Sequence, residues 1–110
     1  MKDLSDATLL RIFIGEQSRH GHQPLYEALV LKAREAGLAG ATVLRGPMGF
    51  GASGRVHTAK ILDLSHDLPI VVEIIDSPEA IDAFLPTLRA MIGDGLATLE
   101  TVRVVRGNRP

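Results

Sequence analysis

The sequence predicts an α+β protein of the ferredoxin-like class, with a four-stranded antiparallel sheet and two helices on one face. Three observations predict it: four segments with strand patterning, two segments with helical periodicity, and their order β-α-β-β-α-β. The 110 residues suit a single domain, residues 1–110, of this class.

The first half of the chain supplies one strand–helix–strand unit. A strand is expected at 8–15, where apolar residues alternate with others, and a polar loop follows at 16–23. Pro24 suits the first position of a helix and Gly37 its end. A second strand is expected at 41–45. The helix carries an apolar stripe at helical spacing, formed by Leu25, Ala28, Leu29, Ala33 and Ala36.

The second half repeats this arrangement. The apolar run at 70–75 predicts a central strand, and Asp76-Ser-Pro-Glu79 is a strong helix start. Because Pro86 cannot donate to the carbonyl four residues earlier, we expect a kink or a second segment there. The last strand is expected at 98–105. The helix stripe consists of Ile81, Phe84, Leu85, Leu88 and Ile92, and Gly93-Asp94-Gly95 ends it.

Apolar residues occupy both faces of several strands, as at Leu9, Phe13, Val43, Val71 and Val105. Two helices cover only one face of such a sheet, so the other face needs a partner. We therefore predict a homo-oligomer with the sheets facing inwards, for which a trimer is a common solution.

Composition excludes several classes of function. A net charge of −1 and a pI near 6.4 disfavour nucleic-acid and membrane-surface binding. The absence of Cys removes disulfides and thiolate chemistry. With no signal peptide and no apolar stretch long enough for a bilayer, we expect a cytoplasmic protein without membrane insertion.

The most informative segment is the long connection between the second and third strands. It contains Gly46, Gly49, Gly51 and Gly54, with Arg55, His57 and Lys60 behind them. Glycine backbone can present N–H groups to an anion, and connections of this length are often functional. The alternative is a plain mobile loop or an extended β-ribbon.

Several blocks together resemble the PII-like signalling family, which is similar to the nitrogen-regulatory PII proteins and more distantly to CutA. The resemblance covers residues 8–105 and implies a ferredoxin-like trimer with ligand clefts between subunits and a regulatory loop, here about 47–66. The blocks are 24–29, 33–46, 49–51, 57–58, 67–76 and 95–100.

The resemblance also implies ligand positions. Gly49-Phe50-Gly51 resembles the base of the PII loop, Thr42 its second-strand threonine, and Gly93-Asp94-Gly95 a turn that approaches nucleotide phosphates. Leu96 stands where PII proteins have Lys. Arg106 matches the second of two PII arginines, while Val104 occupies the first position and Arg103 precedes it. With Arg45, these residues form a candidate anion cradle; the alternative is that the glycines only cap a helix.

Other polar residues offer weaker candidates. His20 and His22 are spaced to share a divalent metal ion, but the alternative is a polar loop in which His22 caps the first helix. Glu73 lies in an apolar strand, so we expect it to pair with Arg45 or Arg11.

The leading hypothesis is a non-enzymatic, trimeric, PII-like sensor with no certain cofactor. It would bind a small anionic effector, an adenine nucleotide, and contact an enzyme or membrane transporter through the loop. The alternative is a CutA-like metal-binding protein that uses His20 and His22. No residues form a catalytic constellation, so an enzyme ranks last.

Overall fold

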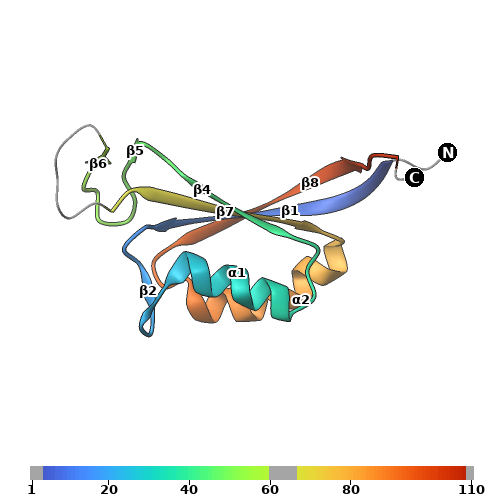
Figure 1. Ribbon diagram of the computed structural model, residues 1–110, viewed down its shortest axis with the longest axis horizontal. Helices are drawn as coiled ribbons and strands as arrows, with labels where there is room; N and C mark the ends of the chain where they lie inside the picture. The colour runs from blue at the N-terminus through green and yellow to red at the C-terminus, as the bar shows by residue number, and fades with distance from the viewer. Residues whose placement is uncertain (1–3, 60–66, 109–110) are drawn as a thin grey trace.

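Four long strands form one antiparallel sheet in the order β4-β7-β1-β8, and both helices lie on one face of it (Figure 1). The computed structural model describes residues 4–59 and 67–108. The ferredoxin-like prediction is therefore confirmed. The elements are β1 (Leu4–Gly15), β2 (Arg19–His20), β3 (Gln23–Pro24), α1 (Leu25–Glu35), β4 (Ala41–Arg45), β5 (Met48–Gly49), β6 (His57–Thr58), β7 (Pro69–Asp76), α2 (Pro78–Met91) and β8 (Leu96–Val105).

The first unit differs from the prediction at two boundaries. β1 begins at Leu4 rather than at residue 8, because it pairs with β8 from Leu4 opposite Val105 to Phe13 opposite Leu96. α1 begins at Leu25, with Pro24 in the preceding cap position and no side-chain cap. The expected capping of α1 by His22 is therefore wrong.

α2 is one continuous helix through Pro86, so the expected second segment does not form. The Ser77 side chain caps its start by accepting a hydrogen bond from the Ala80 N–H at 3.1 Å. Pro86 itself is exposed, while Phe84 and Leu88 on either side of it are buried. Packing of these two side chains holds both turns on the sheet and outweighs the missing backbone hydrogen bond.

The hydrophobic core lies between the sheet and the two helices. The even-numbered residues of β1 and β7 face the helices, because side chains alternate along a strand. We call this the covered face of the sheet. Its core residues are Leu10, Ile12, Ile14, Ile70, Val72 and Ile74, packed against Leu25, Ala28, Leu29, Ala33, Ile81, Phe84, Leu88 and Met91.

The opposite side, which we call the open face, carries both apolar and charged side chains. At its centre Arg11 Nε donates to Glu73 Oε2 at 2.8 Å, which confirms one of the two expected partners of Glu73. Large apolar side chains flank this pair and are exposed: Phe13, Leu44, Ile75 and Leu96. One chain therefore leaves an apolar surface uncovered around a charged centre.

The two ends of the sheet also differ. The β5–β6 ribbon lies at one end, and the start of β1 and the end of β8 lie at the other (Figure 1). Neither α1 nor α2, the helices of the described part, has the length and apolar character needed to cross a membrane.

Candidate functional site

The long connection between β4 and β7 has a regular base. β5 pairs with β6 as a small antiparallel ribbon. Just below it, the Gly46 N–H donates to the Pro69 carbonyl at 2.8 Å, and the Ala59 N–H donates to the Pro47 carbonyl at 2.9 Å. The base is thus a β-ribbon, as in the alternative interpretation of this segment, and it holds the entering and leaving strands together.

Two glycines of this base are needed because the backbone packs closely on Pro69. A Cβ atom at Gly46 would lie 2.9 Å from Pro69 Cγ, and one at Gly49 would lie 3.0 Å from the same atom. Positive φ is not the reason, since only Gly54 in this segment has it, at 74°. The base of the connection therefore packs directly on the Pro69 ring.

A cavity of about 570 Å³ lies beside the ribbon, and we call it the loop-base pocket. It brings Gly49, Phe50 and Gly51 together with Asp94 and Gly95, although 42 or more residues separate the two segments in the sequence. Its other lining residues are Phe13, Ile14, Gly15, Ser18, Ala52, Ser53, His57, Asp67, Pro69, Ile70, Leu96 and Thr98.

The turn that forms one wall of this pocket also ends α2. Gly93 has a φ of 57°, a conformation that glycine favours, and the Gly95 N–H donates to the Ile92 carbonyl at 2.9 Å. A Cβ at Gly95 would lie 2.9 Å from the Phe13 carbonyl oxygen. The turn therefore acts as a helix end and as a pocket wall at once, so the two interpretations of these glycines are compatible.

The ionisable side chains of the loop-base pocket are mostly acidic. The lining includes His57, Asp67 and Asp94, and none of the lining residues that the structure describes is Lys or Arg. Asp67 is partly engaged, since its Oδ1 accepts the Gln17 N–H at 2.8 Å. Apart from His57, the described lining thus offers an anionic ligand no side chain that can carry a positive charge.

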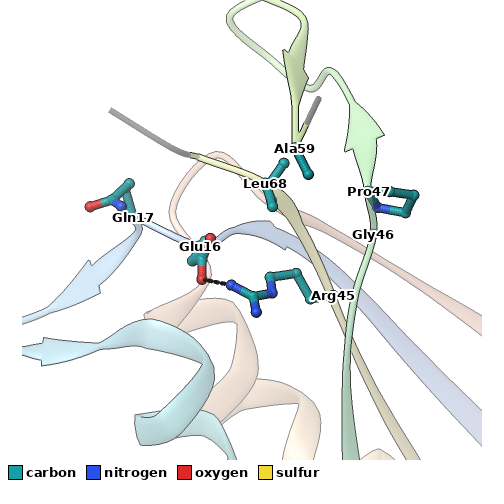
Figure 2. A pocket seen from close by; sticks show the side chains of 7 residues that line it. All are labelled: Glu16, Gln17, Arg45, Gly46, Pro47, Ala59 and Leu68. Carbon is teal, nitrogen blue, oxygen red and sulfur yellow. Dashed lines mark hydrogen bonds and ion pairs between the residues drawn. The ribbon is translucent and has the colours of Figure 1, made fainter. Parts of the chain in front are cut away.

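Arg45, expected in the same cradle, lies in a different cavity, of about 540 Å³ (Figure 2). Figure 2 shows its side chain extending from β4 to Glu16, and Arg45 Nη1 lies 2.8 Å from Glu16 Oε2. Thr42 is opposite Glu73 on the open face and does not line the loop-base pocket. The structure of one chain thus separates these two residues from the glycines. The second cavity is lined by Glu16, Gln17, Arg45, Gly46, Pro47, Ala59 and Leu68.

Arg103 and Arg106 lie at the opposite end of the sheet. Arg103 is opposite Asp6 on β1, whereas the pocket residue Phe13 is opposite Leu96. At roughly 3.3 Å per residue, Asp6 and Phe13 are about 23 Å apart along β1. One chain therefore does not bring these arginines to its own loop-base pocket.

The remaining candidates lie outside this pocket, apart from His57. His20 and His22 are exposed in the β2–β3 hairpin. In the described ranges 4–59 and 67–108, no three His, Cys, Asp or Glu side chains form a group that could hold a metal ion. Arg55 is exposed before β6, and Lys60 lies outside the described residues.

Sequence reasoning missed three contributors to these cavities: Glu16, Asp67 and Pro69. Asp67 and Pro69 immediately precede or begin a buried strand, at the return point of the long connection. A Pro and a carboxylate at such a point were the available signal, because the returning chain must pack against the strand that left the sheet.

Comparison with known proteins places the chain in a family. The model of DUF190, described as "Uncharacterized ACR, COG1993", matches residues 7–104. The chain belongs to the DUF190 family. Two UPF0166 proteins are similar to it: one of Aquifex aeolicus is 42% identical over 97 residues, 88% of this chain and 91% of that protein. One of Methanocaldococcus jannaschii is 31% identical over 102 residues, 92% and 94% of the two chains.

Solved structures similar to this DUF190 protein are PII-like. A protein of Thermus thermophilus described as PII-like signalling has a TM-score of 0.69 and 26% identity, covering 96% of this chain and 95% of its own. CPII of Thiomonas intermedia, a nitrogen regulatory PII-like protein solved with ADP, AMP and bicarbonate, has a TM-score of 0.61 and 20% identity, covering 94% and 92%. The resemblance to PII-like signalling proteins is thus confirmed.

Proposed function

We propose that this DUF190 protein is a non-enzymatic, cytoplasmic, PII-like regulatory protein that binds an adenine nucleotide as a small anionic effector. The loop-base pocket carries the proposal: it joins Gly49–Gly51 with the Asp94–Gly95 turn at the foot of a long loop. Its volume of about 570 Å³ lies within the 300–1,000 Å³ of typical small-molecule sites. The nucleotides bound to CPII support the ligand class.

The effector site is completed between subunits of a homotrimer. Phe13 and Leu96 belong both to the exposed apolar part of the open face and to the pocket lining. If open faces pack against one another, a neighbouring chain would therefore cover the pocket. That neighbour supplies the cations that the pocket lacks, and Arg103 and Arg106, at the far end of β8, are the candidates.

The loop transmits binding to a partner protein. The effector would contact the ribbon through Phe50 and Gly51 and the core through Asp94, so it would fix the ribbon relative to the sheet. Residues 47–66, with Arg55, His57 and Lys60, would then contact an enzyme or a membrane transporter in one ligand state.

Isothermal titration with ATP, ADP, AMP and cyclic dinucleotides tests the effector. We expect micromolar binding of at least one adenine nucleotide to a trimer identified by light scattering. Arg103→Gln with Arg106→Gln should weaken it about tenfold or more, since each loses a charge-assisted hydrogen bond. Arg89→Gln, an exposed arginine of α2, is the matched control. Absence of binding by all these ligands at millimolar concentration would overturn the proposal.

Mixing two variants tests whether a site is shared between chains. Gly51→Glu places a negative charge in the pocket at a position with open space, whereas Arg103→Gln leaves the pocket intact. Neither homotrimer should bind nucleotide well. Trimers reassembled from both chains should regain part of the sites, because an intact pocket can then face an intact Arg103. If reassembly restores nothing, Arg103 is not supplied by a neighbour.

Limited proteolysis tests the response of the loop. Arg55 is exposed and provides a trypsin site within the connection. We expect ADP to slow cleavage after Arg55 severalfold, with the exposed Arg34 of α1 as an internal reference. Equal cleavage with and without bound ADP would show that the loop does not respond to the effector.

A further inference from the structure

His57 belongs to the long connection that we expect to contact a partner, and its place in that connection is at the base. It lies in β6, directly opposite Gly49 of β5. The ribbon therefore holds the imidazole beside the Gly49-Phe50-Gly51 segment. His57 is only partly exposed, and it lines the loop-base pocket.

The imidazole of His57 has an unsatisfied nitrogen. Its Nδ1 is buried and has no hydrogen-bond partner. Buried polar atoms are nearly always hydrogen-bonded, because a buried group without a partner loses its bonds to water and gains none. His57 is the only residue among those described that has such a side-chain atom. Nδ1 has almost no contact with solvent in this chain, so a ligand in the pocket that His57 lines could supply the missing bond only after the ring turns toward the pocket.

The charges around the pocket indicate what His57 contacts. Besides His57, the ionisable lining groups are Asp67, before β7, and Asp94, after α2. β5 and the lining segment Gly49–Ser53 contribute no charged side chain. Among the lining residues in the described ranges 4–59 and 67–108, His57 is thus the one side chain that can carry a positive charge toward a ligand.

We propose that His57 is a ligand-contacting residue whose imidazole turns toward the pocket, so that Nδ1 donates a hydrogen bond to an anionic oxygen of the bound effector. This rests on the function proposed above. Because an anion favours the protonated imidazole, effector binding should take up protons. His57 would also link the effector to the loop, since β6 forms the base of the connection by pairing with β5.

The experiment measures ADP binding by titration calorimetry at pH 6, 7 and 8, in buffers of different ionisation enthalpy. Three variants are compared with the unmodified protein. His57→Asn keeps a neutral N–H donor near the Nδ1 position, and His57→Ala removes it. His22→Gln, at an exposed hairpin position, is the matched control. Circular dichroism and light scattering confirm that each variant is folded and assembled.

We expect His57→Ala to weaken ADP binding about tenfold or more, the usual effect of losing a charge-assisted hydrogen bond. His57→Asn should retain part of the affinity but take up fewer protons than the unmodified protein. His22→Gln should change neither quantity. The ADP phosphates titrate in the same pH range in every sample, so differences between variants report His57 alone.

Two results would overturn the inference separately. If ADP binds the unmodified protein and both His57 variants with equal affinity and equal proton uptake, the effector does not contact His57, while the proposed function stands. If ADP, ATP and AMP fail to bind the unmodified protein at every pH, the proposed function fails and the role of His57 fails with it.

Discussion

The two faces of the sheet differ in how completely one chain buries them. On the covered face, Leu10, Ile12, Val72 and Ile74 are fully buried under α1 and α2. On the open face, Phe13 is 38% exposed and Ile75 is 44% exposed. The residues of the two faces alternate along the same strands, so this difference does not come from local structure. It comes from which face the two connecting helices reach.

This comparison separates the surface that one chain buries from the surface that it leaves exposed. On the covered face, the aliphatic side chains are already buried within one chain. The open face combines an apolar margin with the Arg11–Glu73 pair, and Glu100 lies 3.8 Å from Arg11 at the nearest charged atoms. Burial of such a surface against another chain would be favourable, because it removes apolar area from water. The loop-base pocket lies at one end of the open face.

Neighbouring isoleucines in β7 give the largest expected difference between the faces. Ile74→Ala should lower the free energy of unfolding by about 2–5 kcal/mol, because it leaves a cavity in a packed core. Ile75→Ala, one residue further on the open face, should cost less than half as much in dilute protein. Urea denaturation followed by circular dichroism measures both.

The same pair also tests self-association. Ile75→Ala should shift the oligomer toward smaller species in sedimentation at low concentration, whereas Ile74→Ala should affect assembly only through folding. If both variants lose equal stability and neither changes assembly, the open face is not an interface.

A glycine at the junction between the faces gives the next largest effect. A Cβ at Gly95 would lie 2.8 Å from Ile14 Cγ2, on the covered face, and 2.9 Å from the Phe13 carbonyl oxygen. Gly95→Ala should therefore destabilise the protein by about 1–3 kcal/mol through overpacking. Gly107→Ala, where a Cβ meets nothing within 4 Å, is the control. Equal unfolding midpoints for the two variants in urea would show that the contact relaxes freely.

The helix that covers the sheet depends on a smaller feature at its start. Ser77→Ala removes the side chain that accepts the Ala80 N–H, and we expect a loss of about 1 kcal/mol. Ser77→Asp should retain most of the stability, because an aspartate caps equally well. Thermal unfolding of the two variants checks this. If Ser77→Asp loses as much as Ser77→Ala, the cap is not what Ser77 contributes.

Much of the fold could be predicted because the spacing of apolar residues along each segment indicates whether the segment is a helix or a strand. Strand alternation and helical spacing placed both helices and the four long strands of the sheet. The start of β1 could not be predicted, since Ser5 and Asp6 carry no apolar pattern and become strand only by pairing with Val104 and Arg103 of β8. Such pairing joins residues from the two ends of the chain.

The candidate site was predicted less completely. The Gly49–Gly51 and Asp94–Gly95 segments line one pocket of the chain, and ligand binding by these residues stays a prediction. Arg45 had several carboxylates within possible reach, and only the tertiary structure shows that it pairs with Glu16. Likewise, the burial of His57 Nδ1 depends on the register of β5 and β6, which sequence patterning does not specify.

The smallest expected effect concerns the charged centre of the open face. In a single chain the Arg11 and Glu73 side chains are 35% and 28% exposed, so their coupling should be only about 0.2–1 kcal/mol. A double-mutant cycle of Arg11→Ala and Glu73→Ala, measured by urea unfolding, gives this coupling energy.

Under conditions that favour the oligomer, the coupling energy of Arg11 and Glu73 should rise. A neighbouring open face would remove water from the pair while leaving each charge its partner. A cycle on Lys32 and Glu35, an exposed pair of α1 at 3.9 Å, provides the reference. A coupling that stays constant between dilute monomer and assembled protein would show that the open face keeps its water, and that the two faces differ only because the helices cover one of them.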